Sequence, residues 1–350
     1  MPSYAQASAT VVYSPAVLAT ANKYVDQMLV PQAYYDNLFY GNCFGKPKQP
    51  GTEGRPATQL PSYRRPQRMT RGGTQAEAMV NFETASNLQA FYGGQQLNIR
   101  INQGGTKIFT PWAWYSGYAA MYRTDAAENS GEFKQWDLLK AILDQEWRGS
   151  MTTIETDLLS TNLDINHATG QNSLNGVQHW NSTSPSTGTQ SGLDRSVYTP
   201  FRNQTGTVAS AATGLIDGME AMFYATAQFN GNKPCDVIWM DDTQHGYVVK
   251  QLQAVHRIVG SLDGGDLSTA KTLYFKGIPL VWHSLWAASR QDWFNNADML
   301  AMVLSGQDWA EETPGKPNDI ALAYEVRRYF AGAIMHRRPE TNGVLTVSAA

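Results

Sequence analysis

The side chains best suited to acid–base chemistry are Asp241, Asp242 and His245, which lie close together in the sequence. A carboxylate beside an imidazole can transfer protons near neutral pH. The two aspartates also stand between an apolar run at 236–240 and a helical pattern that continues to about residue 255. Carboxylates at the start of a helix accept its free backbone N–H groups and stabilise its dipole. We therefore interpret the pair as a helix cap.

Other signs of catalysis are absent from the sequence. It contains no GxSxG, GxGxxG, GxxxxGK[ST] or HExxH motif. Its six histidines do not pair at ligand spacing, and zinc sites normally require clustered His and Cys. Cys43 and Cys235 are too few for a disulfide framework and are expected to be reduced. The sequence predicts no catalytic residue, no metal site and no cofactor.

The composition favours a protein with extensive contacts. Charged residues make up 16% of the 350 residues, against roughly 25% in ordinary soluble domains. Ten Trp and seventeen Tyr supply rings with one polar tip, which suit partner surfaces, although an aromatic-rich β protein would show the same bias. The net charge of −3 gives no general attraction to nucleic acid. We find no signal peptide and no apolar run of membrane-spanning length, and expect a cytoplasmic origin.

The first 75 residues form a predicted N-terminal arm. Helical spacing at 14–30 is followed by 41–73, which holds five prolines and seven basic residues against one acid. Proline fixes φ and removes backbone donors, so this stretch is expected to stay extended. It could bind the phosphates of a nucleic acid, or it could be a solvated or partner-bound arm.

Periodicity predicts a mixture of helices and strands after the arm. We expect helices at 76–92, 135–162, 210–229 and 241–255, and strands at 97–101, 236–240, 272–275, 278–283 and 320–338. Residues 103–135 are expected to form one long projecting β-hairpin, and 163–207 an irregular segment. The helix at 135–162 has a continuous apolar stripe of Trp136, Leu139, Leu143, Trp147, Met151, Ile154 and Leu158.

Three stretches in this order resemble the major capsid proteins of tailed bacteriophages, which have the Hong Kong 97-like fold. They are GGTKIF…YSGY…EFKQWD at 104–137, NSLNGVQHW…GLDRSVYTPFRNQ at 172–204 and AGAIMHRRPETNGVLTV at 331–347. The resemblance covers roughly 76–347 and implies an α+β capsid fold. In that family's terms, 1–75 would be the N-terminal arm, 76–102 the start of the P-domain and 103–135 the E-loop. The P-domain with its spine helix would follow at 136–207, the A-domain at 208–315, and a closing P-domain strand at 316–350.

The resemblance also implies a function. Such a chain would be a structural protein of the virion, not an enzyme, and would assemble in the host cytoplasm without membrane contact. Its partners would be its own copies as hexamers and pentamers, the packaged double-stranded DNA, and portal, scaffolding and possibly decoration proteins. An encapsulin-like compartment shell would share the fold. A secreted glycan-binding or hydrolytic β protein with Trp platforms is the alternative of another class.

We expect two groups of residues to form inter-subunit contacts. In the E-loop, five rings would be desolvated, with three acids beside them: Trp112, Trp114, Tyr115, Tyr118, Tyr122, Asp125, Glu128 and Glu132. In the arm, Arg64, Arg65 and Arg68 would bridge to those acids in another copy. Exposed ion pairs contribute only about 0–1 kcal/mol each, so the aromatics should contribute more.

Overall fold

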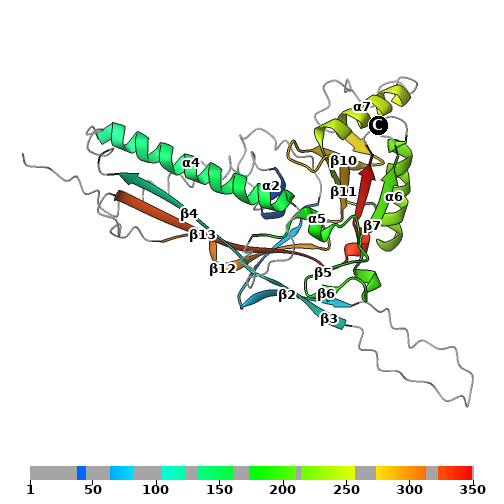
Figure 1. Cartoon of the computed structure of the whole chain (residues 1–350), viewed down its shortest axis with the longest axis horizontal. Helices are drawn as coiled ribbons and strands as arrows, with labels where there is room; N and C mark the ends of the chain where they lie inside the picture. Colours follow the sequence, from blue (N-terminus) through cyan, green and yellow to red (C-terminus); the bar gives the residue numbers. More distant parts are fainter. Residues whose placement is uncertain are drawn as a thin grey trace, which may run out of the picture.

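The computed structural model describes residues 38–44, 64–81, 105–122, 124, 132–160, 173–209, 214–256, 273–312 and 322–348. The molecule is elongated, with a long helix over a four-stranded sheet at one end and a six-stranded sheet with two helices at the other (Figure 1). The predicted helix at 14–30, the strand at 97–101, Asp125 and Glu128 lie outside the described residues.

The four-stranded sheet has the order β1-β12-β13-β4. Its strands are β1 (Gln67–Arg71), β12 (Met299–Glu311), β13 (Leu322–His336) and β4 (Ala113–Tyr122). β1 runs parallel to β12, whereas the two other pairings are antiparallel. The predicted terminal strand is confirmed as β13, whose alternating pattern places Val326, Arg328 and Phe330 on the buried side.

The long helix α4 (Glu132–Leu159) lies along one face of this sheet and confirms the predicted apolar stripe (Figure 1). Leu143, Met151, Ile154 and Leu158 are fully buried. Trp147 packs edge-on against Trp309 of β12, with ring centroids 4.7 Å apart. A stripe at spacings of three and four therefore buries one side of the helix against the strands.

The six-stranded sheet forms the second core, with the order β7-β14-β11-β8-β10-β9. Helices α6 (Leu215–Phe229) and α7 (Asp242–His256) pack against it, as predicted. Its strands are β7 (Gln204–Val208), β14 (Gly343–Val347), β11 (Arg290–Phe294), β8 (Val237–Met240), β10 (Ile278–Trp282) and β9 (Leu273–Phe275). The predicted turn between β9 and β10 contains Gly277, whose φ of 85° suits glycine.

The strands of the two sheets do not follow the expected domain boundaries at 208–315 and 316–350. β12, expected within the unit at 208–315, pairs with β13 in the four-stranded sheet. β14, expected with the closing strand, pairs with β7 and β11 in the six-stranded sheet. Both corrections arise because strand pairing joins segments that are distant in the sequence, which local periodicity does not encode.

A separate two-stranded ribbon corrects two other predictions. β2 (Gln75–Asn81) pairs antiparallel with β3 (Gly105–Pro111), so the start of the predicted helix at 76–92 is a strand. The two strands within 103–135, β3 and β4, do not pair with each other. They follow one another across Trp112 and enter different sheets. The predicted hairpin at 103–135 is therefore wrong, because its first strand, β3, pairs with β2 and not with β4.

Short elements fill the space between the sheets. Helix α2 (Leu38–Phe44) is buried against α4, β1 and β12, in a stretch for which we predicted no helix. Residues 173–203 are mostly irregular, as predicted. They contain α5 (Val177–Trp180), β5 (Thr189–Gln190), β6 (Leu193–Asp194) and the turn η2 (Thr199–Phe201), while η3 (Pro339–Thr341) precedes β14.

Candidate functional site

The Asp241–Asp242 pair begins α7 and has the contacts of a helix cap. The amide N–H of Thr243 donates to the Asp242 carboxylate over 2.7 Å. Burial raises the pKa of Asp241, and the backbone amide of Gln244 partly opposes this increase. His245 faces Trp282, with ring centroids 6.5 Å apart, rather than a carboxylate. The capping interpretation is confirmed.

Among the described residues, no three His, Cys, Asp or Glu side chains are arranged to hold a metal ion. Both cysteines are free and buried. Burial raises the pKa of Cys235 to about 12 and that of Cys43 well above its usual value, so both thiols stay protonated at neutral pH. In the part of the chain that the structure describes, no helix combines the length and apolar character needed to cross a membrane.

The candidate functional site is a row of three large rings on β4. Trp114, Tyr118 and Tyr122 are 48%, 70% and 56% exposed, and we call them the β4 aromatic row. They stand on the face of β4 away from α4. The odd-numbered residues face the helix, as shown by Gly117, where an added Cβ would lie 2.0 Å from Glu146 Oε1. Strand alternation thus places the row on the open face of the sheet.

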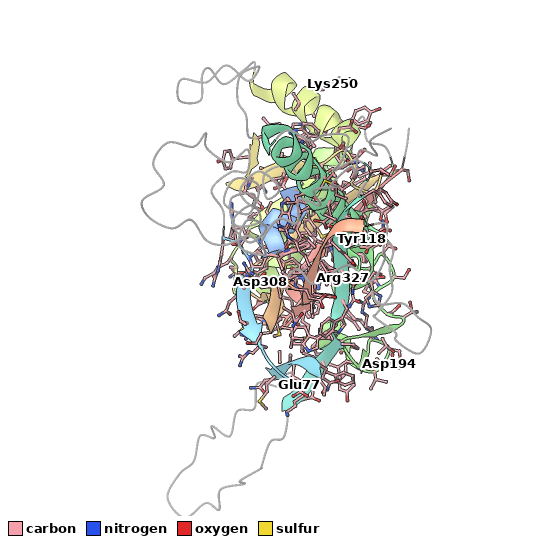
Figure 2. The ribbon with its side chains drawn as sticks, turned by 90° about the vertical axis from the view of Figure 1, so that its left-hand side faces the viewer. Glu77, Tyr118, Asp194, Lys250, Asp308 and Arg327 are labelled. Atoms are coloured by element: carbon pink, nitrogen blue, oxygen red, sulfur yellow. The ribbon has the colours of Figure 1, made fainter. Side chains whose placement is uncertain are left out.

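Charged groups beside the row neutralise one another. Arg327 of β13 is paired with Tyr118 across the two strands, and both side chains point to the same open side (Figure 2). Its Nε donates to Glu325 Oε1 over 2.5 Å, and its guanidinium lies 3.9 Å from Glu312. The Tyr329 hydroxyl donates to Glu312 over 3.1 Å. The rings are thus bordered by charges that already have partners, which suits an apolar contact.

Two of the predicted contact residues belong to the protein's own core. Trp112 is only 3% exposed, and its indole N–H donates to the Gly73 carbonyl over 3.0 Å. The Tyr115 hydroxyl donates to Asp157 of α4 and accepts the Leu174 amide, each over 2.8 Å, and burial raises its pKa. Both side chains are therefore engaged within the subunit, and their inter-subunit contact stays a prediction. Phase could have separated Tyr115 from the row, because it is odd-numbered and faces α4, whereas Trp112 has the even phase of the row and is buried by the β2–β3 ribbon.

The predicted arginines and acids do not form one group. Arg68 of β1 makes an ion pair with Asp308 of the same chain. Arg64 is exposed and Arg65 is half-buried, just before β1. Glu132 is the first residue of α4. The structure therefore gives Arg68 an internal partner, and a bridge from the arm to the acids of another copy stays a prediction.

Sequence reasoning missed the exposed groups of the β2–β3 ribbon and β13. Met79 on β2 and Phe109 on β3 are 69% and 42% exposed. Phe109 is anchored at its backbone, whose N–H donates to the Ser191 carbonyl over 3.1 Å. Alternation along 75–81 could have revealed β2, but the helix-forming residues Ala76, Glu77 and Ala78 favoured the wrong prediction.

No protein-family model matches the sequence, and no curated protein matches it. Solved structures do match. The capsid asymmetric unit of cyanophage A-1(L) superimposes with a TM-score of 0.56 at 12% identity, covering 79% of this chain and 89% of that one. The mature capsid of bacteriophage PhiM1 gives 0.55 at 11%, covering 87% and 92%. The capsid of a native GTA particle gives 0.53 at 10%, covering 85% and 96%.

The chain has the fold of a bacteriophage capsid protein. The resemblance that the sequence indicated is thereby confirmed at the level of the α+β fold. In this capsid-protein fold, β4, which carries the aromatic row, extends along α4 away from the six-stranded sheet (Figure 1).

Proposed function

We propose that this chain is the major capsid protein of a tailed bacteriophage. In this role, its copies assemble as hexamers and pentamers into an icosahedral shell around double-stranded DNA. The capsid-protein fold supports the proposal, and the exposed β4 aromatic row is the observation on which it depends. The protein would act as a structural component of the virion, assembled in the host cytoplasm.

The row has the chemistry of a contact between copies. Three large rings at alternate positions on one face of β4 are about half exposed or more, on the open side of a sheet whose opposite side is covered by α4. Contiguous exposed apolar surface on a soluble protein marks an interaction site. Tyr and Trp are the residues most enriched among those that dominate binding energy, and truncating one costs about 2 kcal/mol or more.

The β2–β3 ribbon would provide a second contact. One face of this ribbon packs into a core cluster with β12 and β13, and its other face presents exposed Met79 and Phe109. We infer that it lies on a neighbouring copy, where the E-loop of the Hong Kong 97-like family would lie. Portal, scaffolding and decoration proteins would be further partners of the assembled shell.

Assembly of the purified chain tests the proposal. The wild-type protein should form closed particles of uniform diameter in negative-stain electron microscopy. The triple variant Trp114→Ser, Tyr118→Ser, Tyr122→Ser should give at least about tenfold fewer particles. Its circular dichroism should be unchanged, because these rings are exposed in the subunit.

A matched variant keeps the rings and removes only the polar tips. Trp114→Phe, Tyr118→Phe, Tyr122→Phe should assemble at close to the wild-type yield, because ring burial dominates the contact. Nucleic acid extracted from particles made in a phage-infected host would support the genome-enclosing role, whereas a protein cargo would indicate a compartment shell. A wild-type chain that stays monomeric at high concentration would contradict the proposal.

A further inference from the structure

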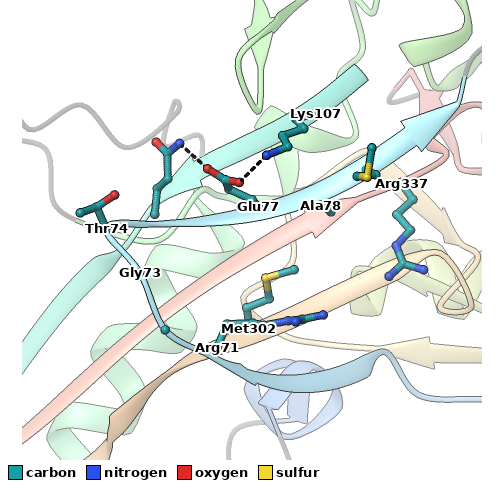
Figure 3. Close-up of a pocket in the computed structure, with 11 residues that line it drawn as sticks. Arg71, Gly73, Thr74, Glu77, Ala78, Lys107, Met302 and Arg337 are labelled. Atoms are coloured by element: carbon teal, nitrogen blue, oxygen red, sulfur yellow. Dashed lines mark hydrogen bonds and ion pairs between the residues drawn. The ribbon is translucent and has the colours of Figure 1, made fainter. Parts of the chain in front are cut away.

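A pocket of about 560 Å³ lies beside the turn that joins β1 to β2, where the β2–β3 ribbon begins (Figure 3). We call it the β1–β2 pocket. Its walls come from four parts of the chain: the end of β1 and its turn, β2 and β3 of the ribbon, β12, and the residue after β13. The residues that line it are Arg71, Gly72, Gly73, Thr74, Gln75, Glu77, Ala78, Met79, Lys107, Met302 and Arg337.

The pocket carries an excess of positive charge. Its three cations are Arg71, Lys107 and Arg337, and its only acid is Glu77. Glu77 is already engaged, because Gln75 Nε2 donates to it over 3.0 Å and Lys107 Nζ lies 3.4 Å away. These contacts lower the pKa of Glu77, so it remains ionised as the partner of Lys107. The two arginines are left without an opposite charge from this acid.

Figure 3 shows why Glu77 does not form an ion pair with either arginine. Glu77 and Lys107 lie on one side of the β2 ribbon, whereas Arg71 and Arg337 lie on the other side, each reaching into the pocket from a different strand. Neither arginine forms an ion pair within 4 Å in the part of the chain that the structure describes. Arg337 does interact with Asp298 at longer range: burial raises the pKa of that carboxyl, and the charges of Arg338 and Arg337 oppose the rise. Nearby Arg68, by contrast, is paired with Asp308.

Arg337 provides a second sign that an acceptor is missing. Its Nε atom is buried and has no hydrogen-bond partner among the described residues. A buried donor without an acceptor is unfavourable, and a guanidinium stays charged at any physiological pH. Its planar fork matches the two oxygens of a carboxylate. The pocket thus presents the exposed guanidinium of Arg71 and the buried, unpartnered Nε of Arg337, and an anionic group from outside the described chain could bind both.

The walls favour a side chain over a nucleic acid. Met302, Met79 and Ala78 supply apolar surface that the methylene groups of Asp or Glu can contact, whereas a sugar–phosphate backbone would leave it uncovered. Each copy carries 30 Asp and Glu residues, so a neighbouring copy can offer a carboxylate of opposite charge to this basic pocket. Its neighbour β1 is one edge of the four-stranded sheet and β4 is the other. Different surfaces at two edges are what head-to-tail ring contacts require.

We propose that the β1–β2 pocket binds an acidic side chain of a second copy of this chain, between Arg71 and Arg337. This inference rests on the proposed function and adds a polar contact to that of the β4 aromatic row. The neighbour's carboxylate supplies the acceptor that both arginines lack, so the pocket helps to fix the register between neighbouring subunits.

Photo-crosslinking within particles tests this contact. Thr74 is exposed and lines the pocket, so we place a benzophenone amino acid at this position. Particles assembled from this otherwise wild-type protein are then illuminated. We expect a product of twice the subunit mass on a denaturing gel, joined to a peptide that contains Asp or Glu. A product of single-subunit mass joined to its own chain, a crosslink to nucleic acid, or no crosslink would overturn the proposal.

Two double variants supply the energetic test. Arg71→Gln, Arg337→Gln should abolish the crosslink and lower particle yield by about tenfold or more. Lys233→Gln, Lys250→Gln removes the same charge from helix α7 and the turn after α6, outside the pocket, and should leave both unchanged. If the two double variants gave equal particle yields while the wild-type protein formed particles, the pocket proposal would be overturned and the proposed function would not. Wild-type protein that forms no particles would overturn both this inference and the proposed function.

Discussion

At the scale of single residues, one buried carboxylate joins segments that are far apart in the sequence. Glu155 of α4 accepts the backbone N–H groups of Phe39 and Tyr40, over 2.9 and 2.6 Å. The Nε2 atom of His283, which follows β10, lies 3.1 Å from the same carboxylate. Glu155 thus links α2, α4 and the six-stranded sheet. Removing one member of such a buried group leaves the others uncompensated.

We predict that Glu155→Gln lowers the free energy of unfolding by about 3 kcal/mol. The amide keeps the size of the side chain, but its NH₂ group cannot accept a hydrogen bond, so one of the two backbone N–H donors loses its acceptor. Urea denaturation measures the change, with Gln145→Ala on the exposed side of the same helix as the control. A loss no larger than that of the control would show that the carboxylate is not needed.

A second buried side chain makes stability depend on pH. His336 is fully buried between Trp180 and Phe294, with ring centroids 5.0 and 6.3 Å away, and Asn342 Nδ2 lies 2.9 Å from its Nδ1. Burial lowers the pKa of His336 to about 3, so the folded protein holds it neutral. The unfolded chain binds a proton near pH 6.5. Between these values the unfolded state binds more protons, so acid favours unfolding.

We therefore expect the free energy of unfolding to fall by up to about 1.4 kcal/mol for each pH unit below about 6.5 through this residue, until the pH approaches 3. The variant His336→Gln should lose this contribution and show a shallower pH dependence, whatever its stability at pH 7. Urea titrations of both proteins at pH 7, 6, 5 and 4 give the two slopes. Parallel slopes would mean that His336 does not carry the effect.

At the scale of elements, the sequence predicted those whose pattern is long and uninterrupted. The apolar stripe of α4 and the alternation of β13 each extend over several turns or residue pairs, so burial on one side determines the structure. β12 was missed because its pattern is interrupted. Gly306 and Trp309 have φ values of 80° and 53°, and the pairing with β13 shifts register between Val303 and Ala310. Such bulges erase a period of two.

Pairing partners were the second limit at this scale. Residues 76–78 have good helix formers, but β3 offers them backbone partners from Ile108 to Thr110, and tertiary pairing outweighs a weak local preference. For the same reason, Trp112 was grouped with Trp114 when the sequence alone was available. Trp112 is buried in a cluster with Ala76 and Ile108 of the β2–β3 ribbon and Met302 of β12, and no local pattern shows that the ribbon covers this residue.

The contact between α4 and β4 leaves no room for a side chain at Gly117. An added Cβ would lie 2.0 Å from Glu146 Oε1 and 2.7 Å from Ser150 Oγ. These two atoms are hydrogen-bonded to each other over 2.7 Å, and Glu146 Oε2 lies 3.8 Å from the buried Arg328. We predict that Gly117→Ala destabilises the fold by about 1–2 kcal/mol, because the methyl group must displace this network.

Gly149 of α4 is the matched control. Nothing lies within 4 Å of its added Cβ, and alanine is favoured over glycine inside a helix. Gly149→Ala should therefore raise the free energy of unfolding by about 0.5–1 kcal/mol. Thermal and urea denaturation of both variants give the two signs. Destabilisation by both substitutions to a similar extent would contradict the close approach of β4 to α4.

At the scale of the whole molecule, the contact groups lie on several surfaces rather than in one cleft. The β4 aromatic row follows one edge strand of the four-stranded sheet, and the β1–β2 pocket lies beside the other edge. The predicted arm arginines Arg64 and Arg65 come just before that second edge. Among the described residues, the three exposed rings of the row make no hydrogen bond or ring contact, whereas many of the surface charges are paired. Apolar contacts should therefore dominate assembly.

This balance predicts how assembly depends on salt. Raising NaCl from 0.1 to 1 M shortens the screening length from about 10 to about 3 Å and weakens exposed ion pairs. Wild-type particle yield, measured by sedimentation and electron microscopy, should change by less than about threefold, because ring burial is not screened. The partly enclosed arginines of the β1–β2 pocket are also less screened than exposed charges.

Charge reversal in the arm then separates the two kinds of contact. Exposed pairs contribute about 0–1 kcal/mol each, so Arg64→Glu, Arg65→Glu should lower particle yield less than the triple serine variant of the β4 aromatic row, and only at low salt. At 1 M NaCl the reversed variant should match the wild type, because screening removes both attraction and repulsion. Unchanged yield at 0.1 M would exclude a role for the arm charges. A collapse of wild-type yield at 1 M would instead show that charges, not rings, hold the copies together.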